Sequence, residues 1–214
     1  MLRARKLASA ALTASLVTAA GIGTAVLSAG TAHAADACPT ASQIVTDINV
    51  IASAAGGLSA KSGALTPSSI PGDVQSAAQS TAAGLNTMIN DFSADTAVLG
   101  GCPEPDSADS QAVADAFRSL TSATQQMLST LTSKHSIFAQ FGVTAPIASS
   151  LRALEAALDS YTYALIAANP SQQSALTNGK DSVDSSVGNA ITLYGQLCIP
   201  SPLYPAVPPV CAAL

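Results

Sequence analysis

The stretch at residues 144–170, TAPIASSLRALEAALDSYTYALIAANP, decides the fold class of this chain. Its large apolar residues recur at intervals of three and four, which places them on one face of an α-helix: Ile147, Leu151, Leu154, Leu158, Tyr161 and Leu165. We expect Thr144 to cap this helix, Pro146 to lie in its first turn and Asn169-Pro170 to end it. The stretch therefore predicts an amphipathic helix that needs partners to bury its apolar face.

Four further stretches show the same periodicity. Helices are expected over residues 40 to about 60, 73 to 99, 108 to 138 or 141, and 171 to about 194 or 198, separated by turns that contain Gly or Pro. No alternating run of strand length occurs between these turns. The sequence therefore predicts an all-α, up-and-down bundle of about five helices, in which short connections make successive helices run in opposite directions.

The two ends of the chain lack this pattern. Arg3, Arg5 and Lys6 precede an apolar run at residues 7–32, and the sequence AHA follows at 32–34. This order predicts a signal peptide over residues 1–34, cleaved after Ala34; the alternative, a transmembrane anchor, is disfavoured by the Ser and Thr residues in the run. Residues 35–198 are then the helical domain, and 199–214 a proline-rich tail expected to lie extended on the surface. We expect a secreted protein, extracellular or in a cell wall, with no transmembrane segment in the mature chain.

The composition restricts the partners. With the signal peptide removed, five basic and 13 acidic residues remain, so the net charge is 5 − 13 = −8 and nucleic acid is not expected as a partner. The whole chain is 48% hydrophobic, 10% charged and 4% aromatic, and it has no Trp. Small neutral polar groups must therefore cover much of the surface. Such a surface suits contact with a wall, a film or a lipid, or an ordinary extracellular domain that carries O-linked sugars.

Four cysteines in an exported chain favour two disulfides, with three possible pairings. Cys38 precedes the first helix and Cys102 follows the second, so an up-down hairpin brings both to one end of the bundle. Cys198 ends the fifth helix at the opposite end, roughly 35 Å away for helices of some 25 residues, whereas a disulfide spans about 4.4–6.8 Å between Cα atoms. We predict the pairs Cys38–Cys102 and Cys198–Cys211. A zinc site is the alternative, but close C-x-x-C spacing is lacking.

No catalytic constellation is recognisable. His135 is the single histidine beyond the signal peptide; it lies on the apolar stripe of the third helix, and no G-x-S-x-G motif accompanies it. The carboxylates are dispersed, and the closest sets, Asp91 with Asp95 and Glu155 with Asp159, are expected on solvated helix faces. We therefore expect a protein that is not an enzyme and that uses no metal or cofactor.

The second half of the chain carries several short patterns: TSKHSIF at 132–138, a short loop through Gly142, a helix with Leu151, Leu154 and Leu158, YAL at 163–165, and V-x-x-A-I-x-x-Y at 187–194. Together they resemble the fungal hydrophobic surface-binding protein family, which includes cell-wall galactomannoproteins. The resemblance implies a secreted or wall-associated fungal protein that adsorbs to hydrophobic surfaces, recruits a secreted hydrolase there and, in some relatives, holds a fatty acid between its helices. Four cysteines and a proline-rich tail depart from that family.

A secreted helical module that binds another protein is the alternative function. Plant inhibitors of invertase and pectin methylesterase are also secreted helical bundles with four cysteines, but the spacing of their early cysteine pair differs from the spacing here. Inhibition or recruitment of an enzyme would distinguish this function from the binding of an amphiphile.

Apolar stripes with few large aromatic residues could leave a cavity between the helices that accepts a fatty acid or similar amphiphile. Its expected lining comes from the second to fifth helices: Leu85, Met88, Phe92, Phe117, Leu120, Leu128, Leu151, Leu154, Leu158, Tyr161, Ile191 and Tyr194. Ordinary core packing is the alternative for each of these residues. Tyr161 and Tyr194 are the candidate donors to a carboxylate head group, because the few basic residues mostly fall off the stripes.

Overall fold

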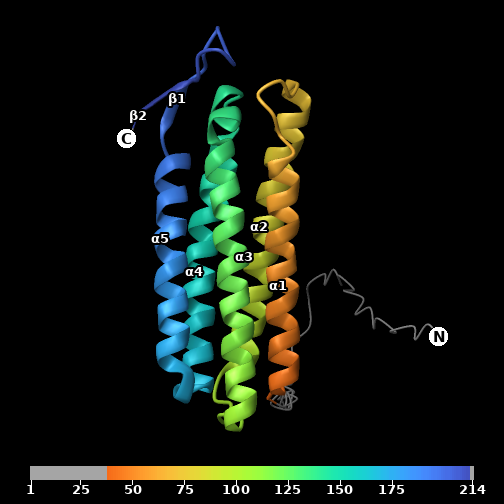
Figure 1. The fold of residues 1–214 in the computed structure, drawn as a ribbon, viewed down its shortest axis with the longest axis vertical. Helices are drawn as coiled ribbons and strands as arrows, with labels where there is room; N and C mark the ends of the chain where they lie inside the picture. The colour runs from red at the N-terminus through yellow and green to blue at the C-terminus, as the bar shows by residue number, and fades with distance from the viewer. Residues whose placement is uncertain (1–37, 213–214) are drawn as a thin grey trace, which may run out of the picture. The chain divides into compact units, whose positions relative to one another are not determined.

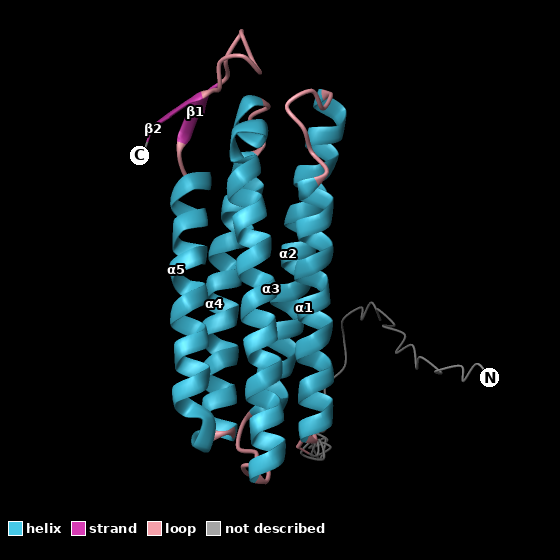
Figure 2. Cartoon of the chain, viewed as in Figure 1, coloured by secondary structure: helices cyan, strands magenta, loops and turns pink. Residues whose placement is uncertain are grey.

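A computed structural model describes residues 38–212 and shows five long helices (Figures 1 and 2). The elements follow one another along the chain: α1 Ala41–Gly63, α2 Pro71–Leu99, α3 Ser107–Gln140, α4 Thr144–Ala168, a 3₁₀ turn at Pro170–Gln172, α5 Gln173–Tyr194, β1 Leu197–Ile199 and β2 Val210–Ala212. The predicted all-α bundle of about five helices is confirmed. The predicted signal peptide lies outside the described residues. Within residues 38–212, no helix combines the length and apolar content needed to cross a bilayer.

Side chains cap the starts of α1 and α3, whereas the start of α4 differs from the prediction. Thr40 and Gln43 form a capping box at the start of α1, and the carboxylate of Asp106 accepts hydrogen bonds from two backbone N–H groups in the first turn of α3. The prediction that Thr144 caps α4 is wrong, because Thr144 is the first helical residue. Val143 occupies the cap position, and its apolar side chain cannot accept a hydrogen bond. Gly142 adopts a positive φ of 68° in the turn before it.

The five helices form a closed ring, and their order around this ring differs from their order in the sequence. α1, α3 and α5 run in one direction, and α2 and α4 run in the other (Figure 1). α3 packs mainly on α1 and α5 and barely contacts α2 and α4, which precede and follow it in the chain, while α2 packs on α4 and on α1. Around the ring the order is α1, α3, α5, α4, α2. The alternating direction was predicted; the ring order was not.

The core lies along the interior of this ring. All five helices contribute buried apolar side chains to one continuous cluster. No Asp, Glu, Lys or Arg is among the buried residues of the described chain. On the outside, Lys180 of α5 forms an ion pair of 2.8 Å with Asp159 of α4. The sequence had suggested that Asp159 is simply solvated. The structure shows instead that it is paired with Lys180.

Both predicted disulfides are present. Cys38 and Cys102 join the segment before α1 to the segment after α2, with Cα atoms 5.6 Å apart, and Cys198 and Cys211 are joined at the opposite end of the bundle. The parity argument holds because α1 and α2 form an antiparallel hairpin, which returns the chain to the end where it began.

The tail folds back on itself and does not run extended throughout. β1 and β2 pair antiparallel, with Cys198 opposite Cys211 and Ile199 opposite Val210. The disulfide connects the two strands, and residues 200–209 form the loop between them. The search for alternating apolar residues missed this hairpin because each strand has only three residues. The pairing of the two strands is fixed by the disulfide and not by such a pattern.

Candidate functional site

The twelve residues predicted to line a cavity all contribute to the interior of the ring. Eleven of them are at most 1% exposed, and Ile191 is half-buried against the same cluster. Phe92 of α2 and Tyr161 of α4 stack at an angle, with ring centroids 5.2 Å apart. The structure thus brings these residues from four helices into one apolar interior. Their role in ligand binding remains a prediction.

Tyr161 lies near the end of the bundle closed by the Cys38–Cys102 disulfide. It lines a pocket of about 10 Å³, room for about one water molecule, together with Asp47 and Asp95 and the apolar side chains of Pro39, Ile44, Val98 and Leu99. Burial, and then the nearby carboxylates of Asp47 and Asp91, raise the pKa of Asp95 to about 6. Asp95 is thus half-buried, with one carboxylate oxygen shielded from solvent, and not fully solvated as expected. Its carboxylate adds negative charge beside the Tyr161 hydroxyl.

Tyr194 lies toward the opposite end, where its hydroxyl already has a partner. It donates a hydrogen bond of 2.7 Å to the backbone carbonyl oxygen of Leu131 on α3. Burial raises the pKa of Tyr194 well above its usual range. A carboxylate head group would have to compete with Leu131 for this proton.

His135 packs between Tyr194 and the tail disulfide. Its ring meets the Tyr194 ring edge-on at 5.0 Å between centroids, and one ring nitrogen lies within 4.8 Å of the sulfur atoms of Cys198 and Cys211. Nε2 of His135 has no hydrogen-bond partner in the described chain, and burial lowers the pKa of the imidazole. The two sulfurs are bonded to each other, so this cluster is a disulfide packed on a neutral histidine and does not offer three free metal ligands.

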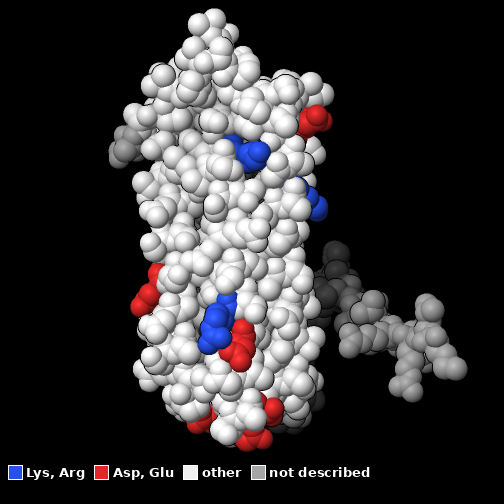
Figure 3. Space-filling model, in the orientation of Figure 1, with Lys and Arg blue, Asp and Glu red and all other residues white. Residues whose placement is uncertain are grey.

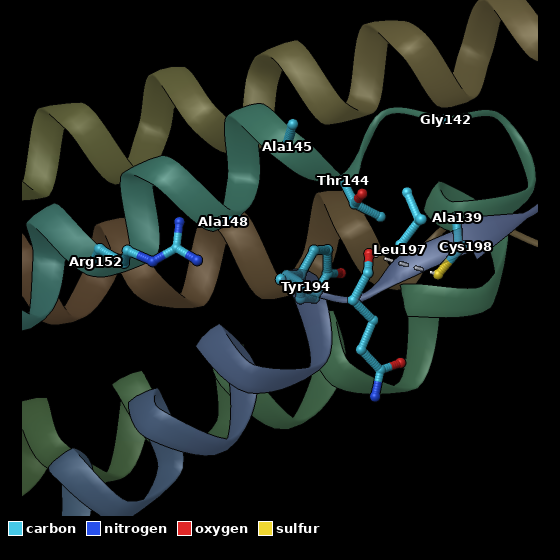
Figure 4. Close-up of a pocket in the computed structure, with 11 residues that line it drawn as sticks. Ala139, Gly142, Thr144, Ala145, Ala148, Arg152, Tyr194, Leu197 and Cys198 are labelled. Carbon is cyan, nitrogen blue, oxygen red and sulfur yellow. Dashed lines mark hydrogen bonds between the residues drawn. The ribbon is translucent and has the colours of Figure 1, made fainter. Parts of the chain in front are cut away.

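A larger cavity of about 350 Å³ lies beside Tyr194, and sequence reasoning missed it (Figure 4). The end of α3, the first turns of α4 and the α5–β1 connection line it: Ala139, Gly142, Thr144, Ala145, Ala148, Arg152, Tyr194, Gly195, Gln196, Leu197 and Cys198. A Cβ atom on Gly195 would lie 3.3 Å from Nη2 of Arg152, so this glycine permits the guanidinium to approach the backbone at the end of α5. The only signal of this cavity in the sequence was a glycine, Gly195, directly after the predicted fifth helix.

The family model described as "Hydrophobic surface binding protein A" matches residues 41–167, which run from α1 to the last residues of α4. The chain belongs to this family. The match also includes the first half of the chain, outside the patterns at 132–194 on which the resemblance was based. Among curated proteins, none matches the chain. The description of this family names a binding activity and no reaction, which agrees with the expectation that the protein is non-catalytic.

Two solved structures share the fold. One is described as the crystal structure of Afmp4p in complex with palmitic acid; its identity is 21%, its TM-score is 0.65, and the alignment covers 72% of this chain and 99% of that one. The other is ligand binding domain 2 of the Penicillium marneffei MP1 protein, complexed with multiple arachidonic acids, at 14% identity, a TM-score of 0.61, and coverage of 72% of this chain and 92% of that one. The likeness establishes a common helical architecture.

Proposed function

We propose that this protein is a secreted, non-catalytic fungal protein that binds a long-chain fatty acid or similar amphiphile between its helices and adsorbs to hydrophobic surfaces. The observation that carries the proposal is the shared fold with two proteins whose structures contain palmitic and arachidonic acids. Family membership supports the adsorption, and two disulfides suit an oxidising, extracellular environment.

The ring architecture offers a route for an acyl chain. α3 barely contacts α2 and α4 across the ring. The centre of the ring is therefore filled by side chains and not by closely packed backbones. Met88 of α2 and Met127 of α3 are fully buried in the core, and methionine side chains repack readily around an irregular apolar guest. Burying each CH₂ group of the guest contributes about 0.8 kcal/mol, which offsets the side-chain packing that it displaces.

The position of the carboxylate head group depends on charge. At the end with Tyr161, the ionised Asp95 repels a carboxylate, whereas a protonated Asp95 does not. At the end with Tyr194, the cavity of about 350 Å³ is lined by Arg152, the one basic residue among its lining residues. We therefore place the head group toward Tyr194 and Arg152, with the chain extending into the ring.

Two experiments test the proposal. Mass spectrometry of the lipid extracted from the protein identifies any ligand that it carries. Calorimetric titration of the delipidated protein with fatty acids of about 14 to 20 carbons then measures binding. We expect binding at micromolar concentrations and a rise in Tm with palmitate. Arg152→Gln should weaken binding of palmitate and leave binding of the uncharged alcohol hexadecanol unchanged. No heat and no shift in Tm with any of these fatty acids would contradict the fatty-acid part of the proposal.

A further inference from the structure

Residues 197–212, which we term the apolar tip, concentrate exposed aliphatic side chains at one end of the bundle. Nine large hydrophobic residues are exposed in the described chain, and five of them belong to this segment of 16 residues: Leu197, Ile199, Leu203, Val207 and Val210. The other four are scattered over α1, the α1–α2 loop, α2 and α4. Isolated exposed hydrophobic residues are ordinary, but a cluster of five within one short segment is not.

The hairpin gives the apolar tip two different faces. Ile199 lies directly opposite Val210, so their side chains share one face of the hairpin, and they are 69% and 70% exposed. Cys198 and Cys211 point to the other face, toward His135 and the bundle. The outer face is therefore aliphatic, and the inner face anchors the hairpin.

The apolar tip also lacks charge and is poor in backbone donors. The last charged side chain in the sequence is Asp184, and the upper projection of the molecule carries no charged side chain in the space-filling view (Figure 3). Five prolines lie between residues 200 and 209, and each removes one backbone N–H group. Both features lower the cost of taking this segment out of water into an apolar phase, where unpaired N–H groups and charges are expensive.

Three attachments hold the apolar tip in place before it meets a partner. The Cys198–Cys211 disulfide closes its base. The amide side chain of Gln140, at the end of α3, donates to the Ser201 carbonyl oxygen at 3.0 Å and accepts from the Ser201 N–H at 2.8 Å. Tyr204 packs against the core. A preorganised segment loses little conformational entropy on binding.

We propose that the apolar tip inserts into the surface of an uncharged lipid phase and orients the bundle with this end against it. A protein partner fits less well, because the segment is a projection without the Arg and Trp anchors that dominate protein interfaces, and without charges to set a register. The inference deepens the adsorption part of the proposed function and rests on it, by naming the segment that makes the contact. It is independent of fatty-acid binding inside the ring.

The absence of Trp from the chain permits a direct test. Leu203→Trp places a single tryptophan on the apolar tip, and Val50→Trp places one on the exposed face of α1 as a matched control. With phosphatidylcholine vesicles, we expect the tryptophan emission of the Leu203→Trp variant to shift to the blue and to be quenched by brominated lipid, equally in low and high salt. The emission of the Val50→Trp variant should neither shift to the blue nor be quenched. An unchanged spectrum of the Leu203→Trp variant with saturating vesicles would overturn the proposal.

A second pair of variants tests whether the apolar tip drives adsorption. Ile199→Asp, Leu203→Asp and Val210→Asp together should lower partition onto the vesicles by about 1,000-fold, since each lost side chain contributes about tenfold. The control combines Val50→Asp, Ile70→Asp and Tyr163→Asp, which add the same charge elsewhere, and it should partition nearly as well as the wild type. Equal loss in both variants, or no loss in the first, would overturn the proposal.

Palmitate binding by the same proteins separates the two functions. The triple variant in the apolar tip should bind palmitate as the wild type does, which also shows that it is folded. Vesicle binding without palmitate binding in the wild type would contradict the fatty-acid function alone. Palmitate binding without vesicle binding would contradict insertion of the apolar tip and would leave the fatty-acid function standing.

Discussion

The hydroxyl of Tyr194 on α5 donates a hydrogen bond of 2.7 Å to the backbone carbonyl oxygen of Leu131 on α3. These helices are not successive in the chain, and the bond ties them together inside the ring, beside the buried ring of His135. We expect Tyr194→Phe to lower the free energy of unfolding by about 1 kcal/mol, the net contribution of one buried hydrogen bond. Tyr163→Phe is the control, because Tyr163 is 63% exposed. Urea denaturation would measure both, and equal stability of the two variants would contradict the prediction.

The side chain of Leu58 on α1 packs directly against Gly84 of α2. A Cβ atom at this position would lie 2.3 Å from Cδ2 and 3.0 Å from Cγ of Leu58, whose side chain is itself buried. Gly84→Ala should therefore destabilise the protein by about 1–3 kcal/mol through overpacking. Gly57→Ala, on α1 with open space around it, should stabilise by about 0.5–1 kcal/mol, because alanine favours the helix. Thermal unfolding of the two variants should show shifts of opposite sign.

Asp95 makes stability depend on pH. Its pKa rises from the ordinary value of 3.8 to about 6 in the folded protein, so the folded state binds more protons than the unfolded state between these values. The free energy of unfolding should therefore fall as pH rises through this window. We expect Asp95→Asn to stabilise the protein by about 1–2 kcal/mol at pH 7, after allowance for partial exposure, and not at pH 3.5.

The matched control for Asp95 is Asp181→Asn, which removes one exposed carboxylate from α5. It changes the net charge by the same amount without relieving a buried charge. Urea denaturation at pH 3.5, 5 and 7 would compare the two variants. A gain for Asp95→Asn that is the same at all three pH values would show that burial of the charge is not the cause.

Leu154 tests the acyl-chain site, because its side chain is fully buried near the middle of α4. Leu154→Trp should fill the space that a bound chain would occupy, at a packing cost of about 1–3 kcal/mol, while far-ultraviolet circular dichroism stays helical. We expect palmitate to raise the Tm of the wild type and of Ala153→Trp, an exposed neighbour, but not that of Leu154→Trp. Undiminished palmitate binding by Leu154→Trp would place the ligand elsewhere.

The sequence by itself determined the helices, because apolar spacing and end signals such as Asp106 and Gly142 are properties of short segments that can be judged without their neighbours. Both disulfide pairs join separate segments, yet they also followed from the sequence. In an up-down bundle, the number of helices between two cysteines decides whether they lie at the same end. The residues that face the interior followed from the sequence as well, because a stripe such as that of Leu151, Leu154 and Leu158 has to be buried somewhere.

Tertiary structure alone decided what each stripe is buried against. Hydrophobic burial has no direction, so the periodicity of α3 could not reveal that it packs on α1 and α5, or that Tyr194 would reach Leu131. The partial burial of Asp95, the approach of Gly84 to Leu58 and the placement of Ile199 beside Val210 on an exposed face depend on residues distant in sequence. Each of these features arises where two segments meet, and a spacing pattern within one segment carries no information about the other.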